Sequence, residues 1–264
     1  MRKRLDQILV ERGLAASRQR AKELVRQGQV VVEGRQLTKP SSVVQVDADV
    51  EILGTPLLYP SRAGLKLEKA LELFQVDVCG LVALDVGAST GGFTSCLLQA
   101  GAKRVYAVDV GQDQLVPELK TDPRVYVFEK TNIRDLTPDK LPSLVDLATI
   151  DVSFISLTKV VPAVCQLLNP HSQVIALVKP QFETEGVGLN KHGVILDPKI
   201  HLTYLPPLIN QLQEDLGLLD FACSPISGMK GNLEYLAHFR LGAPRLDATE
   251  KVCEVIRTGW ERMK

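Results

Sequence analysis

The residues best suited to chemistry lie in a glycine-rich turn between an apolar segment and a helix-like one. The apolar segment is Val82–Val86, and the helix-like segment covers Phe93–Ala100. Glycine allows a backbone to approach a ligand that a Cβ atom would repel. A helix that starts just after a strand also offers free N–H groups to whatever binds there. The turn therefore predicts a ligand site, and the residues expected to form it are Asp85, Gly87, Ala88, Ser89, Thr90, Gly91, Gly92 and Phe93.

A second acid indicates what kind of ligand this site takes. The next apolar segment ends at Asp109, where a carboxylate is placed to hydrogen-bond the hydroxyls of a ribose. The spacing is not the dinucleotide motif G-x-G-x-x-G, because Ala88 and Ser89 directly follow Gly87. An S-adenosylmethionine site fits this loop better than a dinucleotide site. An ordinary glycine turn in an α/β domain is the alternative.

Four more charged residues are expected close to that site. Each lies where an apolar or helical segment starts or ends, and they are Lys66, Asp151, Lys179 and Glu234. A single charge at a strand end is usually solvated, but the carboxyl ends of parallel strands meet at one edge of a sheet. Two lysines and two acids at one edge therefore predict a cluster of complementary charges beside the loop.

Strand and helix patterns alternate in the larger part of the chain. The predicted strands are Val82–Val86, Val105–Val110, Val125–Phe128, Val145–Asp151, Val174–Val178, Phe221–Ile226 and Tyr235–Leu241. The predicted helices are Leu65–Phe74, Gly92–Ala100, Leu157–Leu168 and Pro198–Leu216. This alternation predicts an α/β fold with a doubly wound, mostly parallel sheet of the Rossmann type. Ligands bind such sheets at the carboxyl edge.

The N-terminal region has a different composition from the rest. The whole chain balances 31 basic against 31 acidic side chains, yet residues 1–39 carry ten basic and only four acidic ones. Such asymmetry predicts a basic module that meets a polyanion. Two short helices are expected, Leu5–Arg12 and Arg18–Gln27, the second with Ser17 as its N-cap. Short strands follow, so this module is a small α+β domain.

The second of these helices has two distinct faces. Ala21, Leu24 and Val25 supply its buried face, whereas its basic residues recur every four positions and project as one stripe, Arg18, Lys22 and Arg26. Like charges at that spacing weaken a helix, which is consistent with neutralisation by phosphates. A solvated cationic face is the alternative.

Composition and punctuation limit the remaining possibilities. Tyr59, Pro60 and Ser61 predict a linker, which gives a first domain at 1–58, a linker at 59–62 and a second domain at 63–264. Five scattered cysteines without a C-x-x-C pair, and histidines without ligand spacing, favour free thiols and no metal site. Neither a signal-peptide pattern nor an apolar run of roughly 20 residues is present, so a cytoplasmic protein is expected.

The N-terminal segment, residues 2–53, resembles the S-four-type (alpha-L) RNA-binding domain of a ribosomal protein. The matching stretches are residues 4–6, 9–14, 17–18, 21, 28–30 and 33–34. The resemblance implies binding to folded RNA, largely through phosphates and shape. The residues expected to contact RNA are Arg4, Arg18, Arg20, Lys22 and Arg26.

The order of the four clustered charges resembles the K-D-K-E tetrad of FtsJ-class ribose 2′-O-methyltransferases. The local sequences are similar to those of the TlyA (hemolysin A) family, in residues 61–67, 85–94, 151–157, 177–183, 224–226 and 231–235. The resemblance implies S-adenosylmethionine as cofactor, and methylation of ribose hydroxyls, typically of cytidines, in ribosomal RNA or ribosomal subunits. It also places Asp151, Asn132 and Arg134 in the cofactor site and Phe154 against the adenine ring; a core aromatic is the alternative for Phe154.

The residue types suit this chemistry. A methyl transfer in line requires a hydroxyl that is made nucleophilic and held in alignment with the methyl group. Lys179 is the expected general base, and a second cation, Lys66, together with partial burial would favour its neutral, proton-accepting form. Asp151 and Glu234 oppose that effect while they orient the two ammonium groups. The long connection Glu183–Asp197 contains three glycines and is interpreted as a lid over the site or as a surface loop.

Two other functions remain as alternatives. A membrane-active cytolysin is suggested by the family's second name, but the chain shows no spanning segment and no long amphipathic basic helix, so stable membrane insertion is not expected. An RNA-binding protein that keeps the fold without catalysis is disfavoured by the complete tetrad and cofactor loop.

Overall fold

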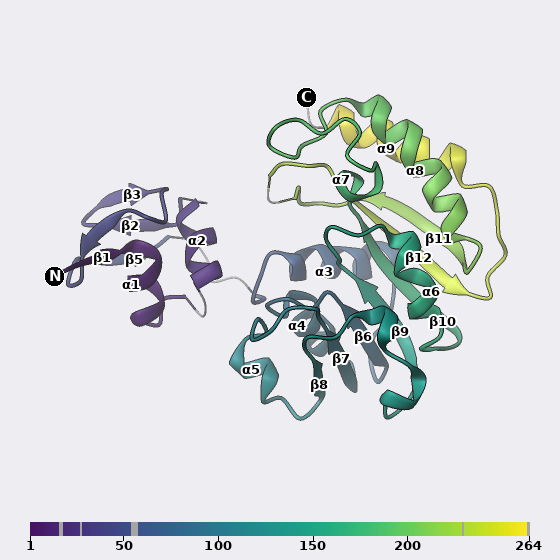
Figure 1. Ribbon diagram of the computed structural model, residues 1–264, viewed down its shortest axis with the longest axis horizontal. Coiled ribbons are helices and arrows are strands. Elements are labelled where there is room, and N and C mark those ends of the chain that lie inside the picture. The colour runs from purple at the N-terminus through teal and green to yellow at the C-terminus, as the bar shows by residue number, and fades with distance from the viewer. Residues whose placement is uncertain (16–17, 27, 54–57, 229, 263–264) are drawn as a thin grey trace. The chain divides into compact units, whose positions relative to one another are not determined.

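The computed structural model describes residues 1–15, 18–26, 28–53, 58–228 and 230–262 (Figure 1). The chain divides into two compact units, Met1–Arg62 and Ala63–Lys264, and each is described by itself. The predicted N-cap Ser17 lies outside the described residues. That residues 59–62 act as a linker stays a prediction.

The first unit is a small α+β domain. The two predicted helices are present, and the apolar face of the second is buried at Ala21, Leu24 and Val25, as predicted. The strands β1 (Arg2–Arg4) and β3 (Arg35–Leu37) have polar sequences, so hydrophobic periodicity could not predict them. They form by backbone pairing, β1 with β4 (Val43–Gln45) and β3 with β2 (Val30–Val32). The elements are β1 (Arg2–Arg4), α1 (Leu5–Glu11), α2 (Arg18–Arg26), β2 (Val30–Val32), β3 (Arg35–Leu37), β4 (Val43–Gln45) and β5 (Val50–Ile52).

The second unit is built on a seven-stranded sheet with the order β11-β12-β10-β9-β6-β7-β8. The strands from β10 to β8 in this order are parallel, and β12 is antiparallel to both of its neighbours. The predicted doubly wound, mostly parallel sheet is therefore confirmed. The strands are β6 (Val82–Val86), β7 (Arg104–Val108), β8 (Val125–Phe128), β9 (Val145–Ile150), β10 (Leu168–Val178), β11 (Leu216–Cys223) and β12 (Tyr235–Leu241).

Helices bury both faces of this sheet. Successive residues of the central strands point to opposite faces, and consecutive residues such as Ile175, Ala176 and Leu177 are all buried. One face packs against α6, α8 and α9, and Figure 1 shows α8 and α9 side by side next to β11. The helices of this unit are α3 (Ala63–Phe74), α4 (Gly92–Gln99), α5 (Pro117–Lys120), α6 (Val161–Cys165), α7 (Pro180–Glu183), α8 (Pro198–Leu212) and α9 (Thr249–Glu261).

Some predicted boundaries were wrong. The expected helix Leu157–Leu168 is a 3₁₀ turn at Leu157–Lys159 followed by the short α6, and β10 begins already at Leu168. Helix α8 ends at Leu212 rather than at Leu216, because the apolar residues from 216 onwards pair with β12 as strand β11. Local apolar patterns do not distinguish a helix end from the start of a buried strand.

The carboxyl ends of β6 and β9 meet where the strand order reverses. The chain places β7 on one side of β6 and then crosses to β9 on the other side. The Asp151 N–H donates to the Val86 carbonyl at 2.9 Å. Gly87 has φ +88°, and a Cβ atom there would lie 2.5 Å from the Asp151 carbonyl oxygen. Only glycine fits between these two backbones, at the point where open α/β sheets bind ligands.

We predict that Gly87→Ala lowers the free energy of unfolding by about 2–4 kcal/mol, since it combines left-handed strain with a backbone clash. Gly186→Ala is a matched control, because Gly186 also has φ +88° but has no neighbour within 4 Å of a built Cβ. It should cost only the strain, about 1–2 kcal/mol. Urea unfolding followed by circular dichroism measures both. Equal losses in the two variants would contradict the close approach.

Candidate active site

The sheet register brings three of the four predicted tetrad residues to one edge. Val178 of β10 pairs with Tyr235 of β12, so Lys179 and Glu234, the residues just beyond this pair, are neighbours. Strand β9 pairs with β10 in parallel and ends one residue before Asp151, which therefore reaches the same edge. These positions follow from strand pairing alone.

The four side chains form two close ion pairs. The Lys66 Nζ, from α3, lies 2.6 Å from the Glu234 Oε2, and the Lys179 Nζ lies 2.5 Å from the Asp151 Oδ1. Lys66 and Glu234 are largely withdrawn from solvent, with side chains 10% and 4% exposed. Buried charges of this kind persist only when they are paired, because the removal of one partner leaves an uncompensated charge. The predicted convergence of complementary charges is thus present in the structure.

Lys179 is held from two sides. Its Nζ donates to the Ser153 Oγ at 3.1 Å, while its contact with Asp151 is an ion pair without the angles of a hydrogen bond. Its side chain is 11% exposed. The amine is therefore oriented at the sheet edge but not sealed from a substrate.

Gln181 was not predicted, although it contacts the cluster. Its Nε2 donates to the Glu234 Oε1 at 3.3 Å, so Glu234 is bound by Lys66 on one oxygen and by Gln181 on the other. Because a carboxylate only accepts, this contact fixes which end of the amide faces Glu234. A neutral glutamine carries no charge pattern that would have revealed this contact in the sequence.

Glu183 connects the segments that carry Lys179 and Asp151. Its Oε1 accepts the backbone N–H of Leu157 at 3.0 Å, and burial raises the pKa of its carboxyl group. The helix α7 is thereby fixed to the loop that follows β9. This contact spans 26 residues of sequence, which is why local spacing did not predict it.

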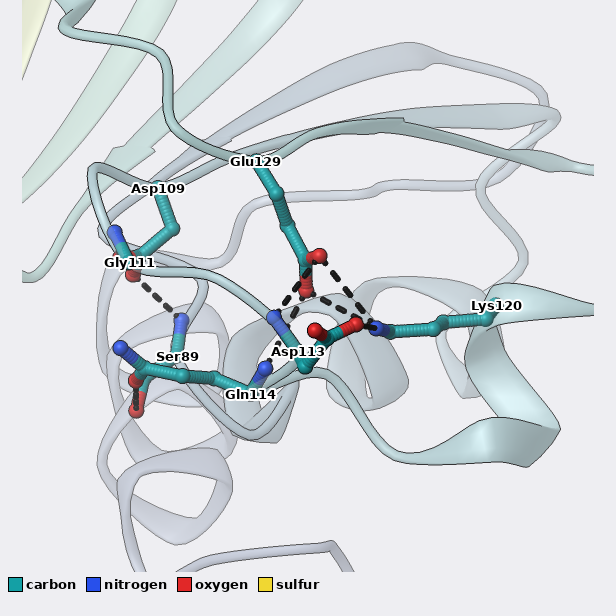
Figure 2. Close-up of polar contacts among 7 residues, drawn as sticks. All are labelled: Ser89, Asp109, Gly111, Asp113, Gln114, Lys120 and Glu129. Carbon is teal, nitrogen blue, oxygen red and sulfur yellow. Dashed lines mark hydrogen bonds and ion pairs between the residues drawn. The ribbon is translucent and has the colours of Figure 1, made fainter.

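The glycine turn and the loop after β7 are joined by Asp109, the predicted ribose acid. Its Oδ2 accepts the backbone N–H of Ser89 at 2.8 Å, and its Oδ1 accepts that of Gly111 at 2.6 Å (Figure 2). Gly91 adopts φ +97° as the N-cap of α4, and no side chain in the described part of this turn caps the helix. The backbone N–H of Thr94 already binds the Asp85 carboxyl group, so the amides left to meet a ligand are those of the turn before Thr94.

Two of the predicted cofactor residues lie beneath the turn. Asp85 is fully buried, and its Oδ2 accepts the Thr94 hydroxyl at 2.6 Å. Burial raises the pKa of Asp85 to about 7. Phe93 is also buried, within the hydrophobic part of the domain. Asp85 binds Thr94 and Phe93 is enclosed by the protein, so both side chains support the turn from within the domain.

The three outlying cofactor candidates differ in their surroundings. The Asn132 Oδ1 accepts the backbone N–H of Arg134 at 3.1 Å and the Arg134 Nε at 3.2 Å. Phe154 is 90% exposed and adopts φ +63°, a conformation that is costly for a bulky residue. Its ring centroid lies 4.8 Å from that of Phe182. Phe154 is thus not a core aromatic, and its strained exposure favours a functional role.

The long glycine-rich loop is tied to the segment that precedes Glu234. The Asn232 Oδ1 accepts the Ile195 N–H at 3.0 Å, and its Nδ2 donates to the Gly193 carbonyl at 2.9 Å. An isolated bridge between Leu189 and Ile195 narrows the loop further. The loop therefore has an anchored base next to the charged cluster.

In the first unit, a buried acid organises two of the five arginines and lysines expected to bind RNA. Arg4 forms a bidentate pair with Asp6 at 2.9 and 3.0 Å, and the Arg18 Nε lies 3.3 Å from the same carboxylate. The hydrogen bonds from Arg4 hold the pKa of Asp6 below its ordinary value. Arg26 is exposed, Lys22 and Arg20 are half-buried, and the role of all five toward RNA stays a prediction.

The described residues form neither a metal-binding group nor a membrane-spanning helix. Within those ranges, no group of three or more histidine, cysteine, aspartate or glutamate side chains is placed to hold a metal ion. No helix in the same ranges has the length and apolar character needed to cross a membrane.

Comparison with known families defines the class of protein. The FtsJ-like methyltransferase family matches residues 59–241, and the S4 domain matches residues 3–50. The first match covers well over half of the chain, so this protein belongs to the FtsJ-like methyltransferase family, with an S4 domain at its N-terminal end. The resemblances given by the sequence motifs are confirmed.

Individual relatives are similar over nearly their whole length. The 16S/23S rRNA (cytidine-2′-O)-methyltransferase TlyA of Mycobacterium tuberculosis is 41% identical over 247 residues, which are 92% of each chain. Hemolysin A of Brachyspira hyodysenteriae is 41% identical over 89% of this chain and 99% of that protein. A solved structure of a protein named as a hemolysin, from Streptococcus thermophilus, has a TM-score of 0.79 and 39% identity, covering 99% of this chain and 97% of that one.

The raised pKa of Asp85 predicts a pH-dependent stability. A carboxyl group whose folded pKa is about 7, above its ordinary 3.8, stabilises the fold fully below pH 3.8 and loses this contribution as the pH rises through 7. Asp85→Asn does not titrate, so its unfolding free energy relative to the natural protein should rise between pH 5 and pH 8.5, by more than about 1.4 kcal/mol. Urea unfolding at the two pH values tests this. A constant difference would show that the pKa of Asp85 is not raised in the folded protein.

Proposed function

We propose that this protein transfers the methyl group of S-adenosylmethionine to the ribose 2′-hydroxyl of a cytidine in ribosomal RNA. The observation that carries the proposal is the pair of ion pairs, Lys66–Glu234 and Lys179–Asp151, beside a glycine turn that is fixed to a strand-end acid. The similarity to an enzyme named as an rRNA (cytidine-2′-O)-methyltransferase supports the substrate class.

The turn between β6 and α4 fits the proposed cofactor. Gly87 and Gly91 adopt positive φ values, and a Cβ atom at either would clash with neighbouring atoms. Asp109 would bind the ribose hydroxyls, and Gly87 to Gly92 would surround the methionine end, supported by the buried Asp85 and Phe93. Asn132, Arg134 and Phe154 would contact the adenosine. S-adenosylmethionine supplies an electrophilic methyl group on a positively charged sulfur.

Lys179 is the proposed general base. As a neutral amine, after its own proton has passed to solvent, it accepts the proton of the 2′-hydroxyl. The hydroxyl oxygen forms a bond to the methyl carbon while the carbon–sulfur bond breaks, and the electron pair stays on sulfur as a neutral thioether. Asp151 and Ser153 hold the amine in place at 2.5 and 3.1 Å, which gives the alignment that such a displacement requires.

Lys66, Glu234 and Gln181 are proposed to orient the substrate hydroxyl. The Lys66 ammonium is fixed by Glu234, which Gln181 holds in turn. A cation at this position stabilises negative charge as it develops on the hydroxyl oxygen. With two lysines and two acids the cluster is neutral in total, so it can form at the buried edge before any ligand binds.

The first unit is proposed to supply the affinity for ribosomal RNA or ribosomal subunits. Arg4 and Arg18 both contact the buried carboxylate of Asp6. Lys22 and Arg26 lie on the same helix as Arg18, α2. Guanidinium groups fixed in this way suit phosphate oxygens. Since ribosomal RNA is the substrate, the protein is proposed to act in the cytoplasm.

We predict that Lys179→Ala reduces methyl transfer to ribosomal subunits by at least 100-fold, because the general base is lost. Binding of S-adenosylhomocysteine and of RNA should stay close to that of the natural protein. Labelled S-adenosylmethionine measures the transfer, and titration calorimetry measures the binding. The control is Lys69→Ala, which removes the surface ion pair between Lys69 and Glu72, whose side chains are 39% and 68% exposed. This variant should keep full activity. A rate above a tenth of the natural one would remove Lys179 from this role.

The basic stripe generates a separate prediction. Replacing Arg18, Lys22 and Arg26 together by glutamine should weaken RNA binding and reduce the slope of log K against log salt by roughly 2–3, since each phosphate contact contributes about 0.7–0.9. Binding of S-adenosylhomocysteine should not change.

The control for this measurement is a triple variant of the second unit with the same loss of charge, Arg245→Gln, Lys251→Gln and Arg257→Gln. It should keep the natural salt slope. If the stripe variant also keeps that slope, these residues form a solvated face and RNA binds elsewhere.

A further inference from the structure

The loop after Asp109 is folded around one carboxylate. Glu129 directly follows β8, and it accepts the backbone N–H groups of Asp113 at 2.9 Å and Gln114 at 3.2 Å (Figure 2). The Lys120 Nζ, from α5, lies 3.2 Å from the Glu129 Oε1 and 3.3 Å from its Oε2. The Leu115 backbone N–H also binds this carboxylate, so several backbone donors and one ammonium fix the loop at a single point.

Gln114 leads from this point back to the glycine turn. Its Oε1 accepts the Ser89 hydroxyl at 3.2 Å, which joins the loop to the turn through side chains as well as through Asp109. A Cβ atom on Gly111 would lie 1.8 Å from the Gln114 Nε2 and 3.0 Å from the Asp109 Oδ1. The amide group of Gln114 therefore occupies the space that a side chain at residue 111 would fill, near the carboxylate of Asp109 (Figure 2).

The chemistry of these two groups is complementary. The carboxylate of Asp109 only accepts hydrogen bonds, whereas the Nε2 of Gln114 only donates them. Its Oε1 is already engaged with Ser89, so the Nε2 is the part of this amide that can serve a ligand. A ribose diol offers hydroxyls that both donate and accept, and can therefore satisfy Asp109 and Gln114 together.

We propose that Gln114 is a further specificity-determining residue of the cofactor site, which donates to a ribose hydroxyl, and that Glu129 is the residue that positions it. This inference rests on the proposed function, because the ligand is the ribose of the cofactor. Gln114 lies in an exposed loop, and the Glu129 carboxylate is what binds its backbone N–H. Loss of that carboxylate should release the amide from the ribose site.

Titration calorimetry on the full chain tests the proposal with two probes, S-adenosylhomocysteine and its analogue that lacks both ribose hydroxyls. Gln114→Met keeps the length of the side chain but removes the donor. It should weaken binding of S-adenosylhomocysteine about 3–10-fold, the value of one hydrogen bond, and leave the affinity for the analogue unchanged. A variant that binds both probes as the natural protein does, or that loses both equally, would overturn the assignment.

Glu129→Gln tests the positioning role. It should weaken binding of S-adenosylhomocysteine to a similar extent. The double variant with Gln114→Met should have the same affinity as the single variant that binds less tightly, because both changes remove the same contact. Additive losses would show that Glu129 acts only on the fold. Lys120→Met, which removes the ammonium on Glu129, provides a second variant should Glu129→Gln fail to fold.

Asp113→Asn is the matched control. Asp113 also contacts Lys120, at 3.1 Å, but its side chain is 76% exposed, and the change leaves its backbone N–H on Glu129. Its affinity for S-adenosylhomocysteine should stay within twofold of the natural value, and a larger loss would contradict a role specific to Glu129. If the natural protein bound neither probe, the proposed function would fail, and the inference with it. Binding by the natural protein together with unaffected variants would reject the inference alone.

Discussion

The backbone contact between Gly87 and Asp151 is the constraint on which the site depends. It joins the end of β6 to the end of β9, the neighbouring strands between which the strand order reverses. It leaves no room for a side chain at residue 87. Asp151 pairs with Lys179, so the turn proposed to hold the cofactor and the amine proposed as base are fixed to one another. A methyl donor and its acceptor must be aligned within fractions of an ångström, and contact between two backbones provides that rigidity.

Electrostatics impose the second constraint. The cluster places two ammonium groups and two carboxylates in a largely buried position, and each charge has a partner. Gln181 and Ser153 add neutral hydrogen bonds that set orientation without changing the total charge. In the loop after Asp109, the Glu129 carboxylate accepts backbone N–H groups and pairs with the Lys120 ammonium. In each case a charged group is held by several partners, so that its position is defined before a ligand binds.

The central sheet could be predicted because its strands carry strong local signals. Strands β6, β8 and β12 were predicted to the residue, since each is an apolar run next to glycine or a charged residue. The parallel arrangement then implied that Asp109, Asp151 and Lys179 lie at one edge. The polar strands β1 and β3 and the helix α9 were missed. The polar strands form by backbone pairing with distant segments. Helix α9 does carry a local signal, because its buried residues Val252 and Ile256 have helical spacing.

Contacts around the candidate site could be predicted only where charge and position coincide. Gln181, Gln114 and Glu129 act through amide groups or backbone N–H groups, and the Gln181–Glu234 bond joins residues 53 positions apart. No residue type or spacing announces such a contact, because it exists only once the sheet has brought the loops together. The same holds for Asp6, whose burial between two arginines depends on how α1 and α2 pack.

We propose that the two ion pairs serve methylation of a ribose oxygen rather than of a base. The most direct test is to incubate the protein with unmodified ribosomal subunits and S-adenosylmethionine carrying a deuterated methyl group. The RNA is then digested to nucleosides, which are identified by mass spectrometry. We expect the label in 2′-O-methylcytidine. Label in a cytidine methylated on its base, or no label in any nucleoside, would contradict it.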